Sequence, residues 1–196
     1  LTLVLTLGLL LALSLPAQAA DLTYEVSGGK LYFDATTGTI TRADETVTEA
    51  DIPSEIYGVP VTAIGDYAFN QRKELTSVTI PSTVTTIGRQ AFGACSSLEQ
   101  VALPDSVTSL GQGVFYGCSG LTDVTLSKNL TSIPRDTFAA CASLTGVTLL
   151  DGITSIGYDA FSGSGLTSLT LPDSVTTLAN SSLANCKSLT SLYIPD

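Results

Sequence analysis

The chain repeats one pattern of apolar and polar positions six times. The repeats begin at Val61, Val84, Val107, Leu130, Ile153 and Val175, so that four intervals of 23 residues are followed by one of 22. One aligned position holds Phe69, Phe92, Phe115, Phe138, Phe161 and finally Leu183. Another holds Leu75, Leu98, Leu121, Leu144, Leu166 and Leu189. A constant period of this length is typical of a solenoid, in which each repeat is one coil.

A single repeat is too small to bury its own apolar side chains. Residues 98–103 predict a short strand, which the turn at 104–106 ends. Residues 84–87 predict a second extended piece, and the helix-like spacing of the apolar residues over 91–95 indicates a brief helix or 3₁₀ segment. One such coil leaves its apolar side chains half exposed, whereas coils stacked about 4.8 Å apart bury them against each other.

These elements predict a mainly β, right-handed repeat solenoid with short helical or 3₁₀ segments. About six coils of 22–23 residues occupy residues 61–196. In the preceding residues 21–60, apolar and polar residues alternate, turns follow, and Ile52 with Pro53 ends a partial repeat. Because a solenoid exposes its end coil, we expect residues 21–60 to form an N-terminal β cap and partial repeat.

The first twenty residues have a different character. Residues 1–13 form an almost unbroken apolar run, shorter than the roughly 20 residues that span a bilayer. The segment Ala17-Gln18-Ala19 fits the small-x-small pattern that precedes a signal peptidase cleavage site. We interpret residues 1–20 as a signal peptide clipped at its N-terminus, which leaves a mature chain without a membrane span. An uncleaved membrane anchor is the alternative.

Composition removes several classes of function. The chain has no histidine, which excludes an imidazole general base, a Ser-His or Cys-His nucleophile pair and a His-ligated zinc. Its 18 acidic and 8 basic residues give a net charge of −10, and nucleic-acid binding needs clustered Lys and Arg. We therefore expect no nucleic-acid partner.

The four cysteines occupy one position of the repeat: Cys95, Cys118, Cys141 and Cys186. They are expected to point inward as buried free thiols, with a disulfide between adjacent coils as the open alternative. A linear column of thiols cannot surround a metal ion tetrahedrally. Acidic residues recur at turns, without calcium-loop spacing or a marked carboxylate pair. The sequence thus predicts no catalytic residue, no cofactor, no metal site and no enzyme.

Threonine and serine fill most outward strand positions, as β propensity on a solvated face explains. Side chains that differ between coils are the ones that can discriminate between partners. The candidate contact positions of the strand face are Glu99, Asp123, Thr148, Thr170 and Tyr193.

The repeats resemble a known family. Residues 61–69 and 80–92 are similar to the BspA-type leucine-rich repeat, also called the Treponema-type repeat, and the resemblance covers residues 52–196. The sequence departs from this pattern at Pro134, Arg72, Ser164, Leu178, Ala179 and Leu183. The departures are expected to weaken individual coils without changing the phase of the repeats.

The resemblance implies a right-handed leucine-rich repeat fold and a function at the bacterial surface. Similar proteins act as surface adhesins of host-associated bacteria, some of which engage extracellular-matrix proteins. The expectation is an exported, non-catalytic protein-binding module, secreted or held at the cell surface. Its partner would be a macromolecule, above all a protein of the host matrix, with a glycan as a further class. The alternative is a passive spacer or targeting stalk for another domain of a longer cell-wall protein.

Overall fold

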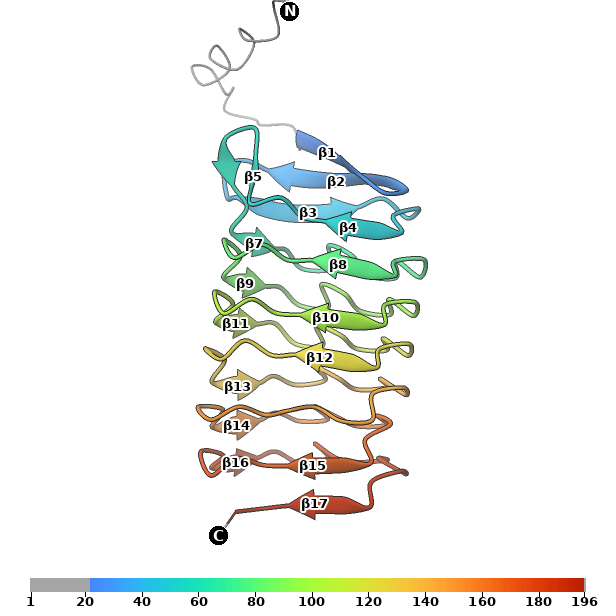
Figure 1. Cartoon of the computed structure of the whole chain (residues 1–196), viewed down its shortest axis with the longest axis vertical. Coiled ribbons are helices and arrows are strands. Elements are labelled where there is room, and N and C mark those ends of the chain that lie inside the picture. Colours follow the sequence, from blue (N-terminus) through green and yellow to red (C-terminus); the bar gives the residue numbers. More distant parts are fainter. Residues whose placement is uncertain (1–21, 196) are drawn as a thin grey trace, which may run out of the picture.

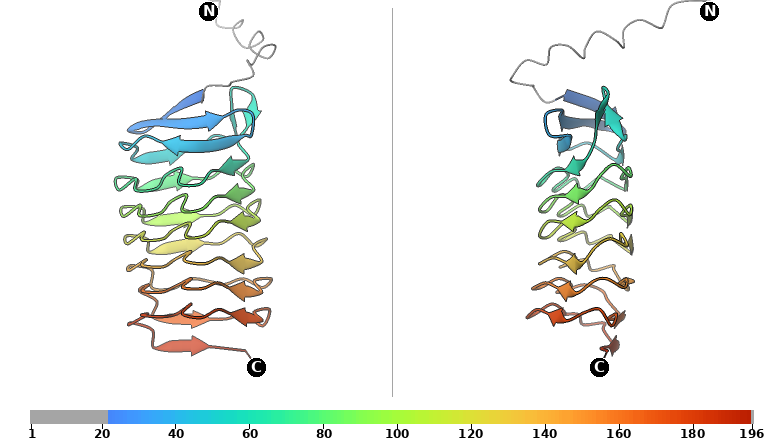
Figure 2. Two further views of the ribbon diagram at one scale, coloured as in Figure 1. Left: turned by 180° about the vertical axis from the view of Figure 1, so that it is seen from behind. Right: turned by 90° about the vertical axis from the view of Figure 1, so that its left-hand side faces the viewer.

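A computed structural model describes residues 22–195 as a stack of coils along one long axis (Figure 1). The stack is a β-solenoid of about seven turns. The two further views in Figure 2 show the coils following one another from the N-terminal strands to β17 (Ser191–Tyr193). The predicted repeat solenoid is therefore confirmed. The signal peptide expected at residues 1–20 lies outside the described residues.

The N-terminal end of the stack is antiparallel. Strands β1 (Leu22–Val26), β2 (Gly29–Asp34) and β3 (Thr39–Ala43) form a meander. Strand β3 then pairs in parallel with β7 (Ala63–Ile64), which joins the meander to the first regular coil. A small hairpin of β5 (Glu55–Ile56) and β6 (Val59–Pro60) lies beside this junction.

Two ladders of short strands run along the stack. The long-strand ladder consists of three-residue strands: β4 (Glu49–Asp51), β8 (Ser77–Thr79), β10 (Gln100–Ala102), β12 (Asp123–Thr125), β15 (Ser168–Thr170) and β17. The short-strand ladder consists of two-residue strands: β7, β9 (Thr86–Ile87), β11 (Ser109–Leu110), β13 (Ser132–Ile133), β14 (Ser155–Ile156) and β16 (Thr177–Leu178). In β10, β12 and β15 the middle residue is buried and its two neighbours are exposed. The exposed residues of the long-strand ladder form what we call the long-strand face.

The core is a set of columns that pass through successive coils. The five phenylalanine rings of the repeat are fully buried and stack with centroids 5.1, 5.7, 5.6 and 5.4 Å apart. Adjacent rings are inclined by only 9° to 17°. In the last coil Leu183 replaces the ring and is only partly buried, and Leu192 is 39% exposed. Each coil thus obtains its buried surface from the coils on either side.

The brief helix or 3₁₀ segment expected over 91–95 is not found, and no helix forms between residues 22 and 195. Instead the backbone passes through consecutive turns, with positive φ angles of 46° at Gln90 and 56° at Ala94. The Cys95 amide donates to the Phe92 carbonyl three residues back, but the Phe92 amide donates to Val114 of the next coil. Because alternate amides bond to the neighbouring coil, a helix cannot form here.

Proline at position 134 has a local effect. At the aligned positions the amides of Gly88, Gly111 and Gly157 donate to the short strand of the preceding coil at 2.7–2.8 Å. Proline has no amide hydrogen and cannot make this bond. Within the described residues the pairing of the short-strand ladder stops after β11 and resumes at β13, in the coil that contains Pro134. The phase of the repeat is unchanged, because Ile133 still pairs with Ile156.

The cysteines form a second internal ladder and are free thiols. Each sulfur donates to the carbonyl of a phenylalanine in the preceding coil, over 3.0–3.1 Å, in the pairs Cys95–Phe69, Cys118–Phe92, Cys141–Phe115 and Cys186–Phe161. In the first regular coil Arg72 takes this position, and its guanidinium donates to the Ala43 carbonyl at 2.7 and 2.9 Å. The thiols therefore satisfy backbone carbonyls that face the core.

The thiols are expected to react with a soluble disulfide reagent in a fixed order. Burial raises the pKa of the Cys141 thiol to about 12, and the Cys95 side chain together with burial raises the pKa of Cys118 well above its ordinary value. Because a buried thiol is out of reach of the reagent, only the half-buried Cys186 is expected to react rapidly in the folded chain at pH 8. Cys95, Cys118 and Cys141 should react at the rate of unfolding.

Mass spectrometry of the labelled peptides measures this order. The control is the urea-unfolded chain, in which all four thiols react alike. Equal labelling of all four thiols in the folded chain would contradict the inward-facing column.

The Cys141 pKa is higher in the folded chain than its ordinary value of 9.0. The stability linked to this thiol is therefore complete below pH 9 and falls as the pH rises from 9 toward 12.

Candidate functional site

Part of the long-strand face is occupied by hydrogen bonds within the solenoid. Just before the long strands, threonine hydroxyls donate to the carbonyl of the preceding coil: Thr76 to Thr48, Thr122 to Glu99, Thr167 to Thr145, and Thr190 to Thr167, at 2.9–3.1 Å. These hydroxyl donors already have acceptors. The threonine array therefore has a structural role in addition to its β propensity.

All five candidate contact residues are exposed on or beside the long-strand face. Glu99 directly precedes β10, and Asp123 begins β12. Thr170 at the end of β15 lies opposite Tyr193 at the end of β17, and the Tyr193 side chain is 57% exposed. Thr148 lies in a segment that forms no strand. The structure thus places the five residues in several coils of one face.

Strand pairing in the long-strand ladder is absent between β8 and β10 and again between β12 and β15, and only the second gap contains a coil without a long strand. The intervening coil contributes residues 145–150, which form no strand, and within the described structure no amide of this segment donates a backbone hydrogen bond. Gly146 stands where the adjacent coils have Asp123 and Ser168, and a glycine in a strand has no side chain to pack. Leu150 also replaces the proline that follows β10 and β15. Of these two departures only Gly146 is peculiar to this coil, because β12 forms although Ser127 stands at the position of the proline.

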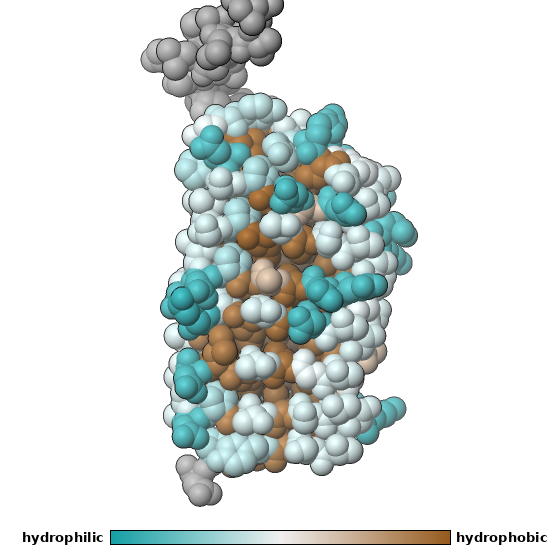
Figure 3. Space-filling model, viewed as in Figure 1, coloured by the Kyte–Doolittle hydropathy of each residue, from teal (hydrophilic) through white to brown (hydrophobic). Residues whose placement is uncertain are grey.

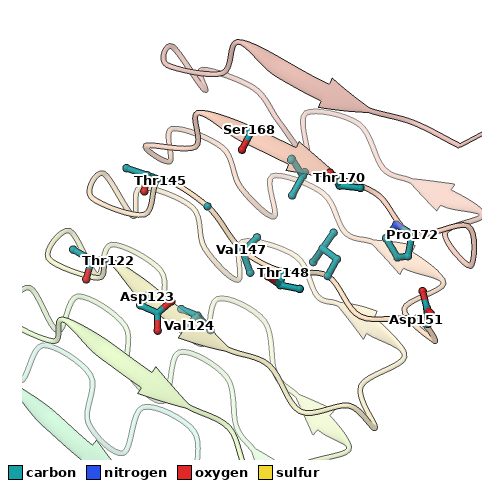
Figure 4. A pocket seen from close by; sticks show the side chains of 13 residues that line it. Thr122, Asp123, Val124, Thr145, Val147, Thr148, Asp151, Ser168, Thr170 and Pro172 are labelled. Carbon is teal, nitrogen blue, oxygen red and sulfur yellow. The ribbon is translucent and has the colours of Figure 1, made fainter.

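The interruption opens a groove of about 680 Å³ in the long-strand face. Residues 122–124 line one side, 145–149 the middle and 168–170 the other side, with Asp151 and Pro172 at one end (Figure 4). Asp123, Thr148 and Thr170 belong to this lining, whereas Glu99 and Tyr193 lie outside it. Asp151, Ser168 and Pro172 were not among the candidates. Only Asp151 had a signal in the sequence, because the preceding Leu150 stands where other repeats have Pro81, Pro104 and Pro172.

The floor and the rim of the groove differ in polarity. An apolar band runs along the stacked coils on the face seen in Figure 3, among polar residues. Val147, in the middle of the groove, is only partly buried, while the aligned Val124 and Leu169 are 6% and 3% exposed. The groove therefore combines an accessible apolar surface with hydroxyl and carboxylate groups.

The charged residues that line the groove, Asp123 and Asp151, are both acidic. No long strand and no residue of the groove lining is Lys or Arg. The ion pairs among residues 22–195 lie elsewhere: Lys30–Glu25, Lys128–Asp105 and Arg135–Asp136. The side chains of Asp123 and Asp151 are exposed and take part in none of them. The groove thus presents two carboxylates without a cation.

Other kinds of site find no support in the described part of the chain. Between residues 22 and 195, no three Cys, Asp or Glu side chains gather as ligands of a metal ion would. The same residues contain no apolar helix of the length that a bilayer requires. The groove in the long-strand face is the candidate functional site.

Comparisons with known proteins agree with this architecture. Residues 61–195 match the family model of the BspA type leucine rich repeat region, in 6 copies. A leucine rich cell surface protein of Faecalibacterium prausnitzii A2-165 is 30% identical, with a TM-score of 0.63 over 88% of this chain and 54% of that one. A leucine rich repeat protein of T. pallidum is 25% identical, with a TM-score of 0.53 over 89% of this chain and 69% of that one.

The chain thus spans about half the length of the F. prausnitzii protein. No protein of curated function is similar enough to count as a match. The family model covers more than half of the sequence, and its copies coincide with the stacked coils. The chain belongs to the BspA-type leucine-rich repeat family.

Proposed function

We propose that the chain is an exported, non-catalytic module that binds a protein partner through its long-strand face. One observation carries this proposal: between β12 and β15 the long-strand face opens into a groove with free carboxylates and an accessible apolar floor. Concave sites with an apolar floor and a few polar groups are the usual form of binding sites. Stacked coils also hold such a site rigid, which lowers the entropic cost of binding.

The partner is expected to contact both the groove and the face beside it. Asp123, Thr148 and Thr170 would act within the groove, and Glu99 and Tyr193 on either side of it. Tyrosine is enriched among the residues that dominate binding energy, and the exposed Tyr193 ring is the aromatic side chain of the long strands. Glu99, Asp123 and Tyr193 differ from the aligned residues of the other coils, as a selective surface requires, whereas Thr148 and Thr170 share one aligned position with Thr79 and Thr125.

Adhesion at a bacterial surface is the proposed biological setting. Two features support it: the signal-like pattern of residues 1–20, and a 30% identical relative described as a cell surface protein. The family resemblance favours a host extracellular-matrix protein as the partner. In the alternative, the solenoid is a spacer or targeting stalk and its exposed faces bind nothing.

Binding of the chain to immobilised collagen, laminin and fibronectin, measured by surface plasmon resonance, tests the proposal. We expect saturable binding to at least one of them, strongly reduced by the double substitution Asp123→Ala and Tyr193→Ala. The matched control is Thr86→Ala with Ser109→Ala, because these exposed residues lie on the short-strand ladder. Absence of saturable binding would favour the spacer. Binding that survives the first double substitution would reject the assigned contact residues.

A further inference from the structure

We propose, on the basis of the protein-binding function above, that the groove receives an extended partner segment carrying two cationic side chains. One cation would pair with Asp123 and the other with Asp151. Figure 4 shows these two side chains toward opposite ends of the groove, with Thr148 between them. The proposal thus commits to a protein with lysine or arginine residues in an extended stretch.

Charge complementarity is the first support. The chain carries 18 acidic and 8 basic residues, and none of the basic ones lies on a long strand or in the groove lining. Asp123 and Asp151 lack an ion-pair partner among residues 22–195, whereas Asp105, at a turn near β10, is paired with Lys128. A cationic partner would supply the missing counter-charges, and an acidic partner would be repelled.

The shape of the groove is the second support. Gly146 leaves its centre open, since a Cβ built on this residue would meet nothing within 4 Å. The methylene stem of a lysine or arginine can lie against the partly buried Val147 while its charged head reaches a carboxylate. The open groove therefore suits long cationic side chains better than compact ones.

The length of the groove sets the spacing of the two cations. Asp123 aligns with Gly146, and Asp151 follows Gly146 by five positions. At about 3.3 Å per residue, the backbone positions of the two aspartates are at most about 16.5 Å apart along the strand direction. Two side chains on the same face of an extended peptide, four residues apart, span about 13 Å. We therefore expect the cationic residues at positions i and i+4 of the partner segment.

Fluorescence anisotropy with two labelled twelve-residue peptides tests the inference on the full chain. One peptide alternates lysine and threonine, which places lysines at i and i+4, and the other alternates glutamate and threonine. We expect the lysine peptide to bind and the glutamate peptide not to bind. Asp123→Asn with Asp151→Asn should weaken binding about three- to tenfold, as two exposed ion pairs do. Binding should also weaken as the salt concentration rises.

The matched control is Glu45→Gln with Glu55→Gln, which removes the same charge from exposed residues outside the groove. It should leave binding of the lysine peptide unchanged. Equal weakening by both pairs would overturn the inference, because the peptide would then respond only to net charge. Lack of binding by the lysine peptide would also overturn it. Thermal unfolding followed by circular dichroism checks that both variants remain folded.

The outcome separates this inference from the proposed function. If a matrix protein binds the chain and Asp123→Asn with Asp151→Asn has no effect, the groove assignment fails and the binding function stands. If the lysine peptide binds in the groove but no matrix protein binds, the groove assignment stands and the adhesin proposal fails.

Discussion

Replacing Phe115 by alanine is expected to lower the free energy of unfolding by about 3–5 kcal/mol. The Phe115 ring is fully buried between the rings of Phe92 and Phe138, at centroid distances of 5.7 and 5.6 Å. Its removal leaves a cavity that faces two coils at once, and the stacked backbone prevents those coils from closing it. Urea unfolding followed by circular dichroism measures the change.

The neighbouring Tyr116 provides the control, because its side chain is 45% exposed. Tyr116→Ala should cost less than about 1 kcal/mol, as most surface substitutions do. Similar small effects of both substitutions would show that Phe115 is not enclosed by the adjacent coils. A loss of cooperativity in Phe115→Ala, with the two halves unfolding separately, would agree with coils that depend on their neighbours.

Replacing Gly111 by alanine is expected to cost about 1–3 kcal/mol, as overpacking does. A Cβ on Gly111 would lie 2.4 Å from the Arg89 amide nitrogen and 2.6 Å from the Gly88 carbonyl carbon. Both are backbone atoms of the preceding coil, so the added methyl can be accommodated only by moving that coil. Urea unfolding measures this cost as a lower midpoint concentration, while the dependence of the unfolding free energy on urea concentration stays unchanged.

Gly146→Ala is the matched control for Gly111→Ala. A Cβ on Gly146 would meet nothing within 4 Å, and its φ angle is not in the left-handed region. We expect a change in stability of less than about 0.5 kcal/mol. Equal tolerance of alanine at both glycines would contradict the close approach of successive coils at Gly111.

The sequence was sufficient to predict the solenoid because one buried position repeats in phase. Phe69 through Phe161 recur at a constant spacing of 23 residues, and only stacked coils place such residues in one column. The inward-facing cysteines followed from the same phase. Free thiols rather than disulfides could be favoured because the cysteines share one column of small apolar positions.

The turn conformation around Phe92 could not be predicted from the sequence. Apolar residues at 91, 92 and 95 have the same spacing in one helical turn and in consecutive β-turns. The difference depends on the acceptor of the Phe92 amide, which is Val114 of the next coil. A local pattern contains no information on that contact.

The groove was only partly predictable. Gly146 and Asp123 were visible as interruptions of the threonine array, to which the other two candidates in the groove, Thr148 and Thr170, belong. That these three line one groove depends on the loss of strand pairing between β12 and β15. This loss involves three coils together, so that no single repeat indicates it. Asp151 was interpreted as a turn residue for the same reason.

The central claim is that the long-strand face is the binding surface. It is tested most directly by paired arginine substitutions on the two ladders, with affinity measured for whichever matrix protein binds the chain most tightly. Thr148→Arg with Thr170→Arg should weaken binding by about tenfold or more, and Thr86→Arg with Ser109→Arg should change it by less than about twofold. All four residues are exposed, so both pairs add the same charge to a folded surface. The reverse result, with binding lost only when the short-strand ladder is changed, would contradict the claim.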